Sequence, residues 1–163
     1  MTIVTNTGPL VILAKIDQLG LLQQMFTSVA IPPAVHRDLL AKSGVVVSRL
    51  DAALAQFIEV VAEPELPPPA VKIVTDHLDT GEQQAIALAH ARNTMLVIDE
   101  RLGRQAARQL GLTVTGSTGV LIEAKQRGYI PAVRPLLEAA RRQGYWLSDE
   151  LITIAAKMAG DDG

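Results

Sequence analysis

Short apolar segments alternate along the chain with longer segments of helical periodicity, and this alternation constrains the fold more than any other feature of the sequence. The pattern is typical of a largely parallel sheet covered by helices, because consecutive parallel strands need a long crossover connection. Each short segment is rich in Val, Ile or Thr and is bounded by Pro, Gly, Asn or Asp. We predict five strands, at residues 2–5, 28–31, 58–62, 95–98 and 113–115.

Helices are expected between these strands, and three more helices are expected after the last strand. Gly111, Gly128 and Gly144 each follow a helical run and precede an apolar residue, as a left-handed cap at a helix C-terminus requires. The helices predicted between the strands cover residues 9–19, 33–42, 48–57, 81–92 and 100–110.

The composition is typical of one globular unit. With 163 residues, 48% of them hydrophobic, the chain is able to bury roughly 70% of its unfolded surface. We expect a single domain over residues 1–163, with an α/β core at 1–116 and C-terminal helices at 117–163. Residues 63–69 are the only candidate linker, and they are too short to separate two domains.

Three negative features favour the cytoplasm. No apolar stretch approaches the ~18 to 20 residues of a membrane span, so we expect no association with a membrane. The first basic residue is Lys15, which is too late for the basic start of a secretory signal. The chain has no cysteine, which excludes disulfides and thiolate zinc sites and is compatible with a reducing compartment.

The net charge of −2 is an average of two regions of opposite sign. Residues 51–100 hold nine acidic and two basic residues, a net charge of −7. Residues 101–142 hold eight basic and two acidic residues, a net charge of +6. Two interpretations stay open, namely a cation site beside an anion-binding surface, or two solvated faces.

Several common kinds of site are absent from the sequence. There is no P-loop, no G-x-G-x-x-G turn and no G-x-S-x-G elbow. His36, His77 and His90 lack the spacing of a helical zinc site, and five scattered aromatic residues are too few for a base-stacking platform. The search for chemistry therefore turns to acidic and amide side chains.

Oxygen-bearing side chains stand where the predicted strands end. Asn6 directly follows the first strand and Asp99 directly follows the fourth, so both are expected at the carboxyl edge of the sheet, where open α/β folds bind ligands. Glu82 lies in the first turn of one helix, and Asp38 lies in the helix that follows two prolines. We expect these four side chains to converge, and hard oxygen ligands suit Mg²⁺ or Mn²⁺.

Each of these residues also has a purely structural explanation. Asp99 could cap a helix that begins at Glu100, and Asp79 with Glu82 has the spacing of a capping box. Asn6 could be an ordinary turn residue at the end of a strand. The residues alone leave both explanations open.

The motifs together resemble a PIN-domain protein, and more narrowly the prokaryotic subgroup related to the toxins of type II toxin–antitoxin pairs. The resemblance covers nearly the whole chain. It rests on Asn6-Thr7-Gly8-Pro9-Leu10, Ile31-Pro32-Pro33-Ala34-Val35 leading to Asp38-Leu39, Asp79-Thr80-Gly81-Glu82, Leu96-Val97-Ile98-Asp99-Glu100-Arg101, Gly116-Ser117-Thr118-Gly119-Val120-Leu121 and Ala124-Lys125-Gln126-Arg127-Gly128-Tyr129-Ile130-Pro131.

This resemblance implies a three-layer α/β/α sandwich whose mainly parallel sheet has the strand order 3-2-1-4-5. It also implies a cluster of acids that holds Mg²⁺ or Mn²⁺ and cuts single-stranded RNA. The four positions of that cluster fall on Asn6, Asp38, Glu82 and Asp99. Asp38 is shorter than the Glu expected there, and Asn6 is uncharged where the family usually has Asp.

The leading prediction is a metal-dependent endoribonuclease that acts as a toxin, with RNA as substrate and a small antitoxin protein as partner. The alternative is a non-catalytic RNA- or partner-binding PIN domain that lost activity through Asn6, and a third option is an enzyme acting on another phosphate ester. Arg101, Arg104 and Arg108 share one predicted helix face, which is either an RNA track or a solvated face.

A homodimer is also expected, mainly because toxins of this family usually pair. The C-terminal helices carry the apolar side chains that such an interface needs, although the same side chains could belong to the core. They are Tyr145, Trp146, Leu147 and Ile152.

Overall fold

The computed structural model describes residues 1–62 and 67–161, and within them five parallel strands form one sheet in the order β3-β2-β1-β4-β5. This confirms the predicted strands and their order. Three strands are shorter than predicted by one or two residues at an end, where ladder hydrogen bonds thin out. The strands are β1 (Thr2–Thr5), β2 (Ser28–Ile31), β3 (Ile58–Val60), β4 (Leu96–Val97) and β5 (Val114–Thr115).

Ten helices surround this sheet in the described ranges, and three of them follow β5 as predicted. None of the ten combines the length and the apolar character that crossing a bilayer requires. They are α1 (Thr7–Lys15), α2 (Gly20–Met25), α3 (Pro33–Leu40), α4 (Val45–Gln56), α5 (Pro69–Thr75), α6 (Thr80–Arg92), α7 (Arg101–Gln109), α8 (Ser117–Gln126), α9 (Arg134–Arg142) and α10 (Asp149–Ala159).

Two helix predictions were wrong in detail. The helix expected over 9–19 ends at Lys15, because the backbone turns left-handed at Asp17 (φ 57°), and the short helix α2 follows it. Helix α5 begins at Pro69, the last residue of the segment interpreted as a linker, since proline suits the first turn of a helix. The rest of that segment includes residues 63–66, which lie outside the described residues.

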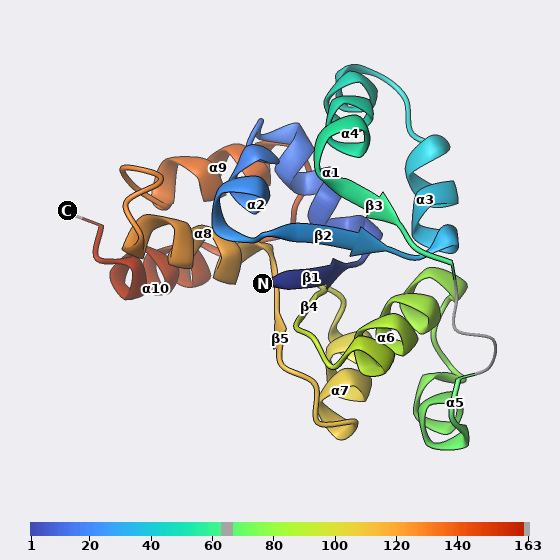
Figure 1. Cartoon of the computed structure of the whole chain (residues 1–163). Coiled ribbons are helices and arrows are strands. Elements are labelled where there is room, and N and C mark those ends of the chain that lie inside the picture. The colour runs from blue at the N-terminus through green and yellow to red at the C-terminus, as the bar shows by residue number, and fades with distance from the viewer. Residues whose placement is uncertain (63–66, 162–163) are drawn as a thin grey trace.

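The sheet is buried on both faces, which makes the fold a three-layer α/β/α sandwich (Figure 1). Successive side chains of a strand point to opposite faces, so Ile3 of β1 joins one apolar cluster and Val4 joins the other. The first cluster packs against α1 to α4 and α8 to α10, and the second packs against α5 to α7.

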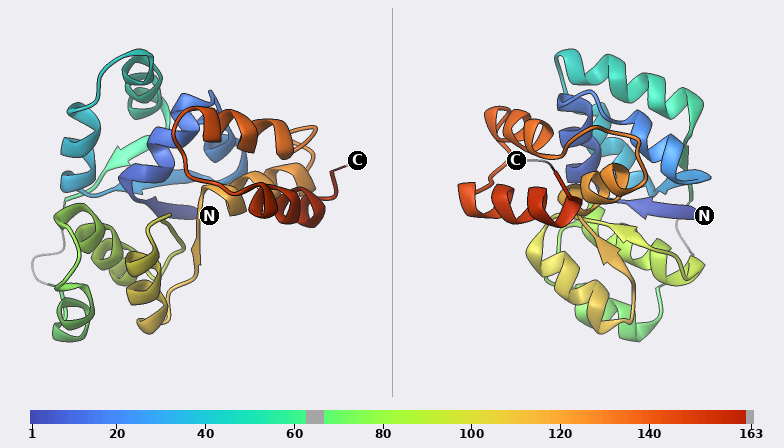
Figure 2. Two further views of the ribbon diagram at one scale, coloured as in Figure 1. Left: turned by 180° about the vertical axis from the view of Figure 1, so that it is seen from behind. Right: turned by 90° about the vertical axis from the view of Figure 1, so that its left-hand side faces the viewer.

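The C-terminal helices α8 to α10 gather at one end of the molecule (Figure 2). The glycines that precede α9 and α10, Gly128 and Gly144, have φ values of 82° and 96°, which confirms the predicted left-handed caps. Leu147 and Ile152 are buried in the first cluster, where they belong to the core, whereas the side chain of Trp146 is 88% exposed.

The strand register brings three chain segments to one edge of the sheet. Thr5 is paired with Val97, and Val97 is paired with Thr115, so the chain leaves β1, β4 and β5 at the same level. In Figure 1 the arrowhead of β2 points toward α3, which packs against α6 near this carboxyl edge. The first residues beyond the strands are therefore close neighbours.

Candidate functional site

Three side-chain oxygens face one point at the start of α6. A methyl group in place of a Gly81 hydrogen would lie 3.0 Å from Asp38 Oδ2, 3.5 Å from Asp79 Oδ1 and 3.7 Å from Asn6 Oδ1. Asn6 is only 8% exposed, and Asp38 accepts a hydrogen bond of 3.0 Å from the Thr7 hydroxyl. Glycine at position 81 therefore leaves room for these oxygens, and Asn6 and Asp38 lie together as predicted.

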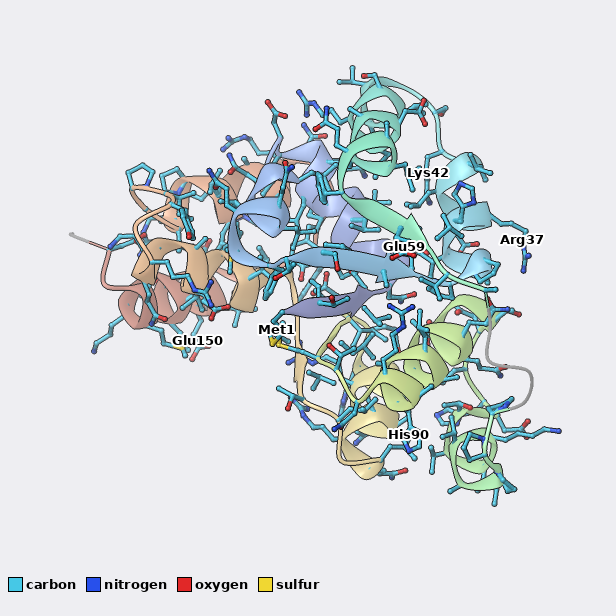
Figure 3. The ribbon with its side chains drawn as sticks, in the orientation of Figure 1. Met1, Arg37, Lys42, Glu59, His90 and Glu150 are labelled. Carbon is cyan, nitrogen blue, oxygen red and sulfur yellow. The ribbon has the colours of Figure 1, made fainter. Side chains whose placement is uncertain are left out.

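A hollow of about 350 Å³ opens beside this point. Arg37 is the basic residue of its lining, but Figure 3 shows its side chain projecting outward from α3 at the margin of the molecule. The hollow is lined by Ala34, Arg37, Asp38, Asp79, Thr80 and Gly81.

Glu82 is the buried acid of the site, with 8% of its surface exposed. Asp79 caps α6, because its Oδ1 accepts a 2.8 Å hydrogen bond from the Glu82 backbone N–H, which confirms the capping role read from the spacing. A methyl group on Gly103 would lie 3.5 Å from Glu82 Oε2 and 3.3 Å from Glu100 Oε2. Burial, followed by the hydrogen bond and charge of Asp79 and then by Glu100, raises the pKa of Glu82 to about 8.

Asp99 is held by the first residue of α8. Its Oδ1 accepts a hydrogen bond of 2.7 Å from the Ser117 backbone N–H, and its Oδ2 accepts one of 2.6 Å from the Ser117 hydroxyl. The two residues meet because they follow the paired strands β4 and β5. Asp99 does not cap α7, whose cap is the Glu100 side chain, so the structural explanation offered for Asp99 was wrong.

Two further side chains lie around Asp99. Burial, and then the negative charge of Asp99, raise the pKa of the Tyr145 hydroxyl, which comes from the segment before α10. Arg104 approaches from α7, where it is half-buried, whereas Arg101 and Arg108 are exposed. The three arginines predicted to share a helix face therefore have different surroundings.

The four predicted residues form separate groups instead of one cluster. Asn6 and Asp38 lie with Asp79, Glu82 lies between Asp79 and Glu100, and Asp99 lies with Ser117. Over residues 1–62 and 67–161, no three His, Cys, Asp or Glu side chains stand together as a ready metal site. The expected convergence is therefore met only in part, since carboxylates without a counter-charge repel one another.

Sequence reasoning missed three contributors to this site. Asp79 was noticed only as a helix cap, although a cap beside a strand end also faces that edge. Glu100 was treated only as the start of a helix. Ser117 stood in a quoted motif without a role, and its place directly after a strand was the signal for its contact with Asp99.

Residues 2–161 match the family described as DUF3368: PIN domain. The chain belongs to the PIN-domain family. Among solved structures, the PIN domain is similar to a PilT N-terminus domain protein, SSO1118, from the hyperthermophilic archaeon Sulfolobus solfataricus P2, with 17% identity and a TM-score of 0.48 over 91% of this chain and 100% of that chain. No curated protein matches the sequence. The PIN domain is a nuclease-type fold.

The donor chemistry of this PIN domain fits a hard divalent cation. Its candidate ligands are carboxylate and amide oxygens, and Mg²⁺ commonly takes one or two carboxylates while it keeps several water molecules. Glu82 gives a second indication, because its pKa is raised where acids crowd without a positive charge. The residues present are thus suited to Mg²⁺ or Mn²⁺, although they are not gathered into one cluster.

Proposed function

We propose that this PIN domain is an endoribonuclease that cuts single-stranded RNA with Mg²⁺ or Mn²⁺. One observation carries the proposal: in a chain of a nuclease-type family, Asn6, Asp38, Glu82 and Asp99 all lie at the carboxyl edge of the sheet. That edge is the usual ligand site of open α/β folds.

The proposed roles follow from the surroundings of each residue. Asp38, Glu82 and Asp99 would hold the cation, and Asn6 would add an amide oxygen. When bound, the cation polarises the scissile phosphate and activates a water molecule. Ser117 keeps the carboxylate of Asp99 in one orientation through two hydrogen bonds. Glu82 must release its carboxyl proton to act as a ligand, because its pKa is above neutrality without the cation.

The test is an RNA cleavage assay of the purified protein with Mg²⁺, with Mn²⁺ and with EDTA. The proposal predicts that single-stranded RNA is cut with either metal and stays intact with EDTA. Cleavage that continues in EDTA would contradict the metal role, and no cleavage under any condition would contradict the nuclease role.

Two observations favour an alternative, a non-catalytic PIN domain that binds RNA or a protein partner. Asn6 provides no charge at the first position of the site. The acids of the described chain also do not form a group of three. This alternative predicts RNA binding without cleavage and no thermal stabilisation by either metal, whereas the nuclease proposal predicts stabilisation by both metals.

The finer role that we propose is that of a toxin controlled by a small antitoxin, which rests on the family resemblance. The basic block at residues 101–142 is complementary to RNA or to an acidic partner. Expression of the chain should arrest growth, and co-expression of a small protein encoded next to it should relieve the arrest. Growth without arrest at high expression would contradict the toxin role.

We also propose a homodimer. Trp146 is 88% exposed, and α10 exposes Leu151, Ile154 and Met158 at a spacing that places them on one face. Light scattering at tens of micromolar should report twice 17.4 kDa, and a particle of 17.4 kDa would contradict the dimer. Trp146→Lys should shift the mass toward the monomer, whereas Ile73→Lys, at an exposed site on α5, should not.

A further inference from the structure

Arg104 lies closer to the candidate site than the other arginines of α7. A methyl group on Gly116 would lie 2.7 Å from Arg104 Nη1 and 2.6 Å from Asp99 Oδ1, so the guanidinium and the carboxylate flank the same point. Arg101 and Arg108 are exposed on the helix, whereas Arg104 is half-buried. Its charged end therefore reaches the carboxyl edge of the sheet beside Asp99.

Within residues 1–62 and 67–161, the guanidinium of Arg104 has no partner. It makes no hydrogen bond and no ion pair there, and both oxygens of Asp99 already accept hydrogen bonds from Ser117. In those same ranges every fully buried side-chain nitrogen or oxygen has a partner, so the nitrogens of Arg104 are accessible to solvent. A permanently charged, half-buried group in this position is available to an anion from outside.

We propose that Arg104 binds a non-bridging oxygen of the RNA phosphate that docks beside Asp99, an inference that rests on the proposed nuclease function. The acids of this edge repel a phosphate, and Arg104 is the positive charge that stands next to Asp99. The planar guanidinium matches two phosphate oxygens, which a lysine ammonium cannot do. Arg104 is thus a phosphate-binding residue of the reaction and not one member of a uniform basic face.

Gly116 provides a way to move Arg104 without removing it. Its φ of −115° is extended, so the backbone does not require glycine there, but the space does. Asp99 Oδ1 is fixed by the Ser117 N–H, whereas Arg104 Nη1 is the end of a flexible side chain. Gly116→Ala should therefore displace the guanidinium and leave Asp99 in place.

The experiment compares Arg104→Ala, Arg104→Lys and Gly116→Ala with Arg92→Ala, a control at an exposed arginine that ends α6. Cleavage of a single-stranded RNA with Mg²⁺ gives kcat and KM, and binding of the same RNA in EDTA is followed against salt concentration. Arg104→Ala should lower kcat about 100-fold, as loss of a transition-state donor does, and reduce the logarithmic salt slope by about 0.7.

The other variants separate charge from geometry. Arg104→Lys should keep the salt slope but recover only part of kcat, and Gly116→Ala should lower kcat although its arginine is intact. Arg92→Ala should leave kcat and KM unchanged. If Arg104 only stabilised Asp99, Arg104→Ala would lower Tm without RNA by several degrees, and that result would overturn the proposal.

Failure of the nuclease proposal is recognised separately. If the natural protein cuts no RNA with either metal, Arg104 is judged by binding in EDTA alone. A slope reduced by about 0.7 in Arg104→Ala, with Arg92→Ala unchanged, then supports the phosphate contact. An unchanged slope, or a kcat equal to that of the natural protein, overturns it.

Discussion

The two sides of the candidate site differ in how their charges are compensated. On the Asp99 side, both carboxylate oxygens accept hydrogen bonds from Ser117, and Arg104 places a positive charge nearby. On the Gly81 side, the oxygens of Asp38, Asp79 and Asn6 face one point, and the basic residue of that hollow projects outward. The comparison teaches that Asp99 is already oriented without a cation, whereas the Gly81 side has negative charge that a cation would relieve.

Removing the charge of Asp99 should have the largest effect on this comparison. We expect Asp99→Asn to reduce metal-dependent RNA cleavage below detection, because an amide is a weak ligand and its NH₂ group conflicts with a Ser117 donor. Stability should fall by only about 1 to 2 kcal/mol, since one hydrogen bond to a charged group is lost. Cleavage assays and thermal unfolding measure the two effects.

Asp76→Asn is the matched control, because Asp76 is an exposed aspartate at the end of α5. It should leave cleavage unchanged. If Asp99→Asn cuts RNA at the natural rate, the Asp99 side is not part of the reaction and the proposed site is wrong.

The sequence was sufficient for the sheet and for the location of the site. Strands such as Thr2–Thr5 are short apolar runs, and parallel pairing then brings the residues after them, Asn6 and Asp99, to one edge. The strand order came from the family resemblance, and the structure confirms it. These features depend on pattern and chain direction, which a sequence displays directly.

The sequence was not sufficient for short helices and for side-chain partners. The helices Gly20–Met25 and Pro69–Thr75 have fewer than two turns or barely two, so no period was visible. The contact of Asp99 with Ser117 depends on strand register, which a sequence does not print. The separation of Arg104 from its neighbours depends on the space at Gly116.

Glu82 connects the two sides, and its titration should give the next largest effect. Its pKa is raised from 4.5 to about 8, so the folded state holds a proton that the unfolded state releases in this window. In EDTA, stability should therefore be highest below pH 4.5 for this group and fall as pH rises toward 8, by up to about 1.4 kcal/mol per pH unit. Glu82→Gln should remove this contribution.

Unfolding in denaturant at several pH values measures that slope. Glu59→Gln is the control, because Glu59 is an exposed glutamate on β3. Its profile should follow that of the natural protein. Equal slopes in the natural protein and in Glu82→Gln would mean that Glu82 is not the titrating group.

Adding charge to the Gly81 side tests its need for a cation. Asn6→Asp places a third carboxylate near Asp38 and Asp79, so metal-free stability should fall by about 1 to 2 kcal/mol after solvent screening. A doubly charged cation attracts the new carboxylate more than its neighbours repel it, so stabilisation by Mg²⁺ or Mn²⁺ should increase, and cleavage should be maintained or raised. A metal at 100 times its Kd stabilises by about 2.7 kcal/mol.

Asn93→Asp is the control for this change, because Asn93 ends α6 at an exposed site away from the candidate residues. It adds the same charge and should show no metal effect. If neither the natural protein nor Asn6→Asp is stabilised by either metal, and neither cuts RNA, the non-catalytic alternative is the better explanation.

Asp79→Asn should have the smallest effect, because it removes one cause of the Glu82 shift and leaves the largest. Asparagine caps a helix about as well as aspartate, so α6 should keep its N-terminus and stability should change little at pH 4. The pKa of Glu82 should fall by about one unit but stay above 4.5, since burial is the first cause of its rise. The pH window of the stability slope should therefore narrow without closing, whereas Asp76→Asn should leave it unchanged. A window that closes would mean that Asp79, and not burial, controls Glu82, and an unchanged window would assign the charge effect to Glu100.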